Sequence, residues 1–398
     1  MKRQPFLILI SVVLTLYFFL PSNLDAIPAF ARKYQISCQV CHSPAPRLKP
    51  FGEDYAGNGY RLTEYESPRY FIQAGDEKLS LLREVPLAIR IDGIGTYNFE
   101  NSKQVDFGLL SGVKLLSGGE LSDHLSYYFY FFMSEAGNIV GIEDAFLTYT
   151  DLFGSGINIS AGQFQACDPF YKRELRLTLE DISILKASPG TSSASLTYDR
   201  GVFLDYEIPK LNTGIVVEVL NGSGIGGGGE ELLFDKDKYK NILGYLKQPI
   251  GKSVALGFMG YTGKELLFDA PNTYESNVTI FGPSLNLDFN QHLMINVQYL
   301  FRNDSRLYDE TSMVIVEDLA TKGGYLEAIY APKGDMSKFY LTGLLNLVES
   351  DYDPLNYKSA TLNLSYVLRR NVRLLTEFTW VDRDEKYGKV SCGFMAAF

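Results

Sequence analysis

The chain has 398 residues, enough for two or three ordinary domains or for one large barrel with a small attachment. It contains 27 Tyr, 26 Phe and 36 Gly but a single Trp, a composition that favours strands and turns over helices. The net charge of −10 argues against nucleic-acid binding, because that function needs a basic surface.

A secretory signal peptide is predicted at residues 1–26. Lys2 and Arg3 form a basic start, an uninterrupted apolar run covers 6–20, and Leu24-Asp25-Ala26 offers a cleavage site. The apolar run is shorter than the roughly 20 residues of a membrane-spanning helix, which favours cleavage over an uncleaved anchor. No comparable run follows, so the exported protein is expected in the periplasm, outside the cell, or in the outer membrane as a barrel.

Residues 38–42 read Cys-Gln-Val-Cys-His, which is a covalent haem-attachment motif. Two thiols three positions apart can each add to one vinyl group of a haem, and the adjacent His42 can then bind the iron as proximal ligand. A thioredoxin-like pair would need a βαβ context, and a zinc site would need more Cys or His ligands nearby. We therefore predict one covalent haem c, bound by Cys38, Cys41 and His42, in a cytochrome segment over 27–70 that a linker over 71–84 follows.

The flanks of this motif extend the argument. Residues 26–60 resemble the haem segment of a family of fused monohaem cytochrome–porins, outer-membrane proteins of the iron-oxidase type. That resemblance implies that electrons enter from extracellular Fe(II) and pass to a periplasmic c-type cytochrome, an Fe(II):cytochrome c oxidoreductase activity. The residues that carry the resemblance are Pro28, Phe30, Ala31, Arg32, Cys38, Cys41, His42, Leu48, Phe51, Gly52, Gly59 and Tyr60.

The haem segment lacks a usual sixth ligand for the iron. Between residues 27 and 84 there is no Met, and His42 is the only His. The ligand must then come from the barrel, from an unusual donor such as Lys49 or Tyr55, or from water. The barrel candidates lie on predicted lumen-facing positions or beside predicted periplasmic turns, and they are His292, Met294, His124 and Met133.

From residue 85 to 398 the sequence alternates apolar and polar residues in short segments, as transmembrane β-barrels do. In 360–369, for example, Leu362 and Leu364 alternate with Asn363 and Ser365, so the leucines should face lipid and the polar residues the lumen. Seven short turns and eight longer loops, among them 264–277 and 303–321, join about sixteen strands, with fourteen or eighteen as alternatives. The terminal Phe398 resembles the last-strand signal of outer-membrane assembly.

The predicted fold is therefore all-β. We expect a transmembrane antiparallel β-barrel of about sixteen strands in the outer membrane of a Gram-negative bacterium. The short c-type haem segment is expected inside the barrel or at its mouth, because it precedes the first strand.

A second resemblance concerns one loop of the barrel. Residues 162–175 and 199–202 are similar to a segment of phosphate-selective porins, which implies that the loop from Cys167 to about Ser195 folds inward and narrows the lumen. An ordinary surface loop is the alternative. Cys167 and Cys392 could form a disulfide only if they were close in space. Alternation places Cys392 on the lipid face, so we expect two separate cysteines.

These features together predict an outer-membrane electron conduit. One alternative is a conduit that runs in reverse, to an extracellular acceptor. The other is an anion-type porin in which the haem is only a structural plug. The sequence has no Ser/His/Asp arrangement, phosphate loop or carboxylate pair that points to another kind of catalysis.

Overall fold

The computed structural model describes residues 29–62, 71–72, 81–82, 85–99, 105–135, 138–139, 141–166, 173–226, 233–235, 237–269, 272–309 and 313–398. The predicted signal peptide and Cys167 lie outside these residues, as does most of the predicted linker, of which β1 (Phe71–Ile72) and β2 (Leu81–Leu82) form a two-stranded sheet.

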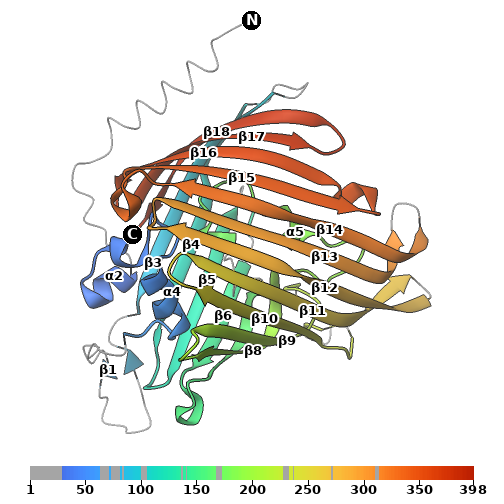
Figure 1. Cartoon of the computed structure of the whole chain (residues 1–398), viewed down its shortest axis with the longest axis horizontal. Helices are drawn as coiled ribbons and strands as arrows, with labels where there is room; N and C mark the ends of the chain where they lie inside the picture. The colour runs from blue at the N-terminus through green and yellow to red at the C-terminus, as the bar shows by residue number, and fades with distance from the viewer. Residues whose placement is uncertain are drawn as a thin grey trace, which may run out of the picture.

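Sixteen of the described strands form one closed antiparallel barrel, which confirms the predicted fold (Figure 1). Neighbours in sequence pair with each other, and β18 closes the barrel by pairing with β3. The strands are β3 (Leu87–Asn98), β4 (Val105–Glu120), β5 (Leu125–Glu135), β6 (Gly141–Tyr149), β7 (Asn158–Gln165), β8 (Tyr198–Ile208), β9 (Thr213–Leu220), β10 (Asn241–Ile250), β11 (Val254–Asp269), β12 (Asn272–Phe289), β13 (Leu293–Asp309), β14 (Val314–Tyr330), β15 (Phe339–Ser350), β16 (Tyr357–Arg369), β17 (Val372–Asp382) and β18 (Lys386–Ala397).

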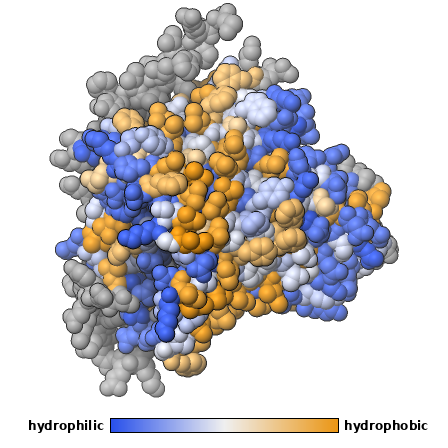
Figure 2. Space-filling model, viewed as in Figure 1, coloured by the Kyte–Doolittle hydropathy of each residue, from blue (hydrophilic) through white to orange (hydrophobic). Residues whose placement is uncertain are grey.

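The predicted alternation of lipid-facing and lumen-facing residues is confirmed. On β16, Leu362 and Leu364 are 52% and 47% exposed, whereas Asn363 and Ser365 are fully buried. The same pattern along neighbouring strands gives the apolar band that crosses the wall in Figure 2. Such a band is the surface that a barrel presents to lipid, because closure has already satisfied the backbone hydrogen bonds. Cys392 lies on the outer side of β18, where its sulfur contacts the Thr376 hydroxyl.

The loops predicted at 264–277 and 303–321 are wrong in extent. In the structure β11 and β12 remain paired up to Asp269 and Asn272, and β13 and β14 up to Asp309 and Val314. Above the lipid band both faces of a hairpin meet water, so the strands lose their apolar alternation while the backbone ladder continues. A polar stretch of sequence therefore predicts a loop at positions where the two strands are still paired.

The loop after β7 folds into the lumen, as predicted, over its described residues 173–197. It contains two short helices, η2 (Arg173–Leu175) and α5 (Ser183–Lys186), and it buries Leu177, Ile182 and Leu185. Polar side chains of the barrel wall bind its backbone: Asn346 donates to the Asp181 carbonyl at 2.9 Å. This inner loop occupies one side of the lumen and leaves a narrower space beside it.

Residues 29–62, here called the N-terminal segment, close the end of the barrel that carries the short turns (Figure 1). The segment contains α2 (Ala29–Tyr34), α3 (Cys38–Cys41) and α4 (Pro50–Gly57). Its ion pairs and hydrogen bonds reach several sides of the mouth: Arg32 Nη2 to the Leu87 carbonyl at 2.6 Å, Arg61 to Glu120 at 3.4 Å and Lys49 to Asp335 at 2.7 Å.

Three further short helices, η1 (Leu152–Gly154), η3 (Gly334–Met336) and η4 (Asp353–Leu355), lie between strands. No helix in the described part of the chain has the length and apolar content needed to cross a membrane.

Candidate functional site

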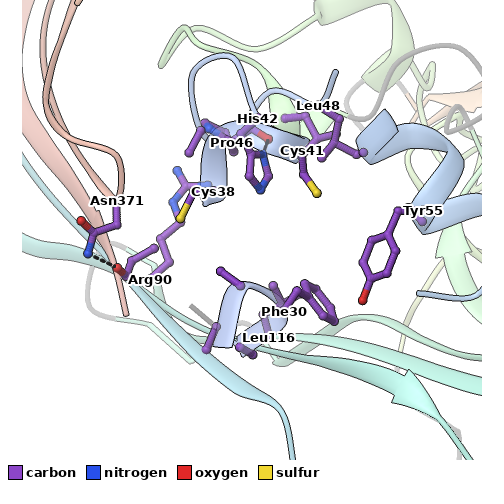
Figure 3. Close-up of a pocket in the computed structure, with 18 of the residues that line it drawn as sticks. Phe30, Cys38, Cys41, His42, Pro46, Leu48, Tyr55, Arg90, Leu116 and Asn371 are labelled. Carbon is purple, nitrogen blue, oxygen red and sulfur yellow. Dashed lines mark hydrogen bonds between the residues drawn. The ribbon is translucent and has the colours of Figure 1, made fainter. Parts of the chain in front are cut away.

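The two cysteines of the Cys-Gln-Val-Cys-His sequence lie on a single helical turn, α3. The Ser37 side chain caps its start by accepting a hydrogen bond from the Gln39 amide at 3.3 Å, and the His42 amide donates to the Cys38 carbonyl at 2.9 Å. One turn of helix brings residues three apart to the same face, so both thiols point the same way. Figure 3 shows the sulfur atoms of Cys38 and Cys41 and the imidazole of His42 around one open space.

The imidazole of His42 is fixed by backbone carbonyls. Its Nδ1 lies 2.9 Å from the Pro46 oxygen and 3.2 Å from the Arg47 oxygen. A carbonyl only accepts, so Nδ1 must carry the proton, which leaves the Nε2 lone pair free for a metal ion. Burial lowers the pKa of His42 and thereby favours the neutral ring that a metal requires.

The thiols do not have the electrostatics of a redox pair. Burial raises the pKa of Cys38 and of Cys41, and the neighbouring Cys38 raises that of Cys41 further. A thioredoxin-like nucleophile needs a lowered thiol pKa. The described residues also contain no group of three His, Cys, Asp or Glu placed to bind a metal ion, as a zinc site would require. Of the three interpretations of the motif, haem attachment fits this environment best.

The space in front of His42 is a cavity between the N-terminal segment and the barrel wall. It contains about 1450 Å³ free of protein atoms, including the part open to solvent. Aromatic rings form one side: Tyr60 stacks on Phe30 at 5.1 Å and on Tyr128 of β5 at 4.8 Å. Leu116 of β4 and Met395 of β18 line the cavity from the barrel wall, with Glu174 of the inner loop.

Two buried hydroxyl groups on this cavity interact only with each other, and outside well-formed hydrogen-bond geometry. They belong to Tyr34 and Tyr55, each only 7% exposed. A buried hydroxyl is more stable with a well-formed hydrogen bond, so a polar group in the cavity would complete the hydrogen bonding of this pair. A haem has a large apolar ring, which fits the aromatic walls, and two carboxylates at one edge, which can accept hydrogen bonds from these hydroxyls.

The structure places none of the four predicted barrel ligands in the lining of this cavity. His124 and His292 are exposed at turns, and Nδ1 of His124 hydrogen-bonds the Thr150 carbonyl. Met133 is 44% exposed, and Met294 packs against Leu177, Ile329, Ala331 and Tyr340 in a separate apolar cluster.

The cavity instead contains a thioether that the sequence analysis missed. Met395 of β18 is 3% exposed and lines the cavity. The unusual donors Lys49 and Tyr55 differ from each other: Tyr55 lines the cavity, whereas Lys49 is bound to Asp335. In the last strand, the apolar alternation marks the lipid-facing residues. Met395 lies between two of them and faces inward, so this pattern does not select it.

Charged residues join the inner loop to the barrel wall beside the cavity. Glu174 binds Lys114 of β4 at 3.0 Å and Arg176 at 3.6 Å. Burial raises the pKa of Glu174, but Lys114, Arg176 and Arg90 outweigh it and lower that pKa to about 2. The carboxylate is therefore ionised at neutral pH and holds the loop against the wall.

Comparisons with known proteins agree with this architecture. OmpT of Vibrio cholerae is 12% identical, with a TM-score of 0.55, and the match covers 79% of this chain and 99% of that one. The anion-selective porin of Comamonas acidovorans has the same identity and coverage with a TM-score of 0.54. OmpF of Salmonella typhi is 9% identical, with a TM-score of 0.56 and coverage of 79% and 97%.

The protein thus has the fold of outer-membrane porins, and the predicted outer-membrane location agrees with that fold. No protein-family model matches the sequence, and neither does any curated protein.

Proposed function

We propose that this protein is an outer-membrane electron conduit with one covalent haem c in the cavity between its N-terminal segment and the barrel wall. The observation that carries the proposal is the geometry of His42. Its Nδ1 is held by the Pro46 carbonyl at 2.9 Å, and its ring points into an apolar cavity that both thiols border.

Each residue of the motif has a definite task in this proposal. The thiols of Cys38 and Cys41 would hold the haem through a thioether bond to each vinyl group, and Nε2 of His42 would bind the iron. The haem iron, once bound, supplies the reversible one-electron change between Fe(III) and Fe(II). The chain orients the ring through Phe30 and Tyr60, excludes water through burial, and holds the His42 tautomer through Pro46.

The position of the N-terminal segment supports a periplasmic partner. Short turns mark the periplasmic end of bacterial barrels, and the segment closes that end. Val40, between the two cysteines, and Phe51 of α4 are 36% and 43% exposed. Exposed apolar residues beside a redox centre suit a small, transient interface with a soluble c-type cytochrome. The electron donor in this proposal is extracellular Fe(II).

The direct test uses the purified holoprotein without oxygen. Oxidised protein is mixed with Fe(II), and the absorption bands of the haem are followed. Appearance of the reduced bands supports the proposal, whereas a haem that a chemical reductant reduces but Fe(II) does not would exclude Fe(II) as donor. A reverse conduit would instead show oxidation of the reduced haem by a soluble Fe(III) chelate. The Cys38→Ala/Cys41→Ala variant, which cannot form either thioether, is the control for absorbance that does not come from the motif.

The second candidate function is an anion-type porin in which the haem is a structural plug. The observation that favours it is the fold, which is shared with the anion-selective porin of Comamonas acidovorans. Its test is single-channel conductance in a planar bilayer. Stable anion-selective currents through the holoprotein would support this alternative, and their absence together with reduction by Fe(II) would support the conduit.

A further inference from the structure

A second, polar chamber lies in the lumen next to the cavity just described. It contains about 840 Å³ free of protein atoms, including its open part, and it shares Arg90, Glu174 and Met395 with the first cavity. Its walls come from β3, β4, β5, β17 and β18 and from the inner loop. The charged residues that line it are four cations and two carboxylates, namely Arg90, Lys114, Arg176, Arg373, Asp92 and Glu174.

Three of the four cations have a carboxylate within the chamber. Arg90 Nε binds Asp92 at 2.9 Å, while Lys114 and Arg176 share Glu174. Arg373 of β17 is different. Its Nη1 donates to the Leu177 carbonyl at 3.1 Å and to the Ser365 hydroxyl at 3.4 Å, and no carboxylate of the described residues lies within ion-pair distance.

The Nε–H of Arg373 also lacks a hydrogen-bond acceptor among the described residues. This atom is buried and has no hydrogen-bond partner in the described part of the chain, although the residue is only 4% exposed. Asp92 and Glu377 attract this charge from beyond contact distance. The free N–H is nevertheless unfavourable, because it has lost water without gaining an acceptor. The residues that line the chamber include four cations and two carboxylates, and Asp181, 3.8 Å from Arg176, and Glu377 lie just behind this lining.

Another buried arginine of the same lumen shows what full pairing looks like. Arg302 of β13 is 2% exposed and donates five hydrogen bonds. Two go to Asp304, two to backbone carbonyls of the inner loop and one to Ser192. A guanidinium has five N–H donors, so every donor of Arg302 is used. The unfilled Nε of Arg373 is therefore not a general feature of arginines in this barrel.

We propose that the chamber binds an anionic oxygen group, which completes the hydrogen bonding of Arg373. Carboxylates and inorganic oxyanions share this chemistry. One source is a propionate of a haem bound in the adjacent cavity. This case rests on the proposed function. The other source is a free oxyanion such as phosphate. This case does not depend on the haem.

Equilibrium dialysis with labelled inorganic phosphate separates the two sources. It compares the holoprotein with the full-length Cys38→Ala/Cys41→Ala variant, each with and without Arg373→Gln. If the chamber takes a propionate, the haem-free variant binds phosphate and the holoprotein does not, because the site is filled. If it takes a free oxyanion, both bind phosphate. In either case Arg373→Gln weakens phosphate binding by about tenfold or more, since a hydrogen bond to a charged group is lost.

Arg302→Gln is the matched control, because it removes a buried arginine of the lumen without touching the chamber. Arg373→Lys keeps the charge and should retain most of the binding. Heat-modifiable mobility on gels confirms that each variant forms the barrel. Absence of phosphate binding to the folded haem-free variant would overturn the proposal, as would binding that Arg302→Gln and Arg373→Gln weaken equally. A chain that never attaches haem but binds phosphate through Arg373 would refute the proposed function and leave this inference intact.

Discussion

Replacing Gly52 by alanine is expected to displace α3, the turn that carries Cys38 and Cys41. Gly52 lies on α4 against α3, and a Cβ at this position would lie 2.5 Å from the carbonyl oxygen of Cys41 and 3.1 Å from its Cα. Real Cβ atoms do not approach other atoms closer than 3.0 Å, so the two helices must separate by at least about 0.5 Å. The obstacle is backbone that no rotamer change can move away. Overpacking of this kind costs about 1–3 kcal/mol.

The assay is haem content per chain, from haem-stained gels, together with the reduction potential of the haem. We expect Gly52→Ala to lower the haem content or to shift the potential, because Cys41 and His42 move with α3. Gly57→Ala on the same helix is the matched control, since nothing lies within 4 Å of its Cβ and alanine favours a helix. If Gly52→Ala matched Gly57→Ala in both measurements, the close contact of α3 and α4 would have no role in placing the haem.

Three further predictions concern the same site. The Cys38→Ala/Cys41→Ala variant should lose haem staining on denaturing gels, and an undiminished stain would rule out thioether attachment by this motif. Met395→Leu should lower the reduction potential and convert a low-spin haem spectrum to a high-spin one if its thioether is the sixth ligand. Met294→Leu is its control, because Met294 lies outside the cavity, and identical spectra for both would exclude Met395. Stability should depend on Glu174 at low pH: its pKa is depressed in the folded state, so its contribution is complete above about pH 4.5 and is lost as the pH falls towards 2. A thermal midpoint that stays constant between pH 4.5 and 2 would contradict this.

The barrel could be predicted from the sequence because its pattern is local. Each strand of a closed barrel has the same two environments, lipid and lumen, and alternation records them residue by residue, as Leu362 and Asn363 show. The pattern ends where the lipid ends. The long hairpins of β11–β12 and β13–β14 therefore escaped prediction, because their outer parts have water on both faces.

The site was predictable in part for the same reason. The spacing of Cys38, Cys41 and His42 lies within one helical turn, so the sequence alone defines the chemistry of that turn. The barrel residues that line the cavity depend on which strands the N-terminal segment faces. That choice depends on contacts between residues far apart in sequence, such as Arg32 with Leu87. Alternation identifies Met294 and Met395 as inward-facing, but only the three-dimensional structure separates one from the other.

The two candidate functions make opposite demands on the lumen. A diffusion channel needs a continuous aqueous path, whereas a conduit for electrons needs a cofactor shielded from water within a closed wall. In this barrel the inner loop buries Leu177, Ile182 and Leu185 on one side of the lumen, and the N-terminal segment closes the short-turn end. What remains beside the loop includes an aromatic cavity at the motif and a cationic chamber behind it. A cationic chamber repels bare Fe(II), so an Fe(II) donor would have to give up its electron from outside the chamber. The conduit hypothesis therefore places the encounter with Fe(II) outside the chamber, whereas anion conductance through a porin would fall when Arg373 is removed.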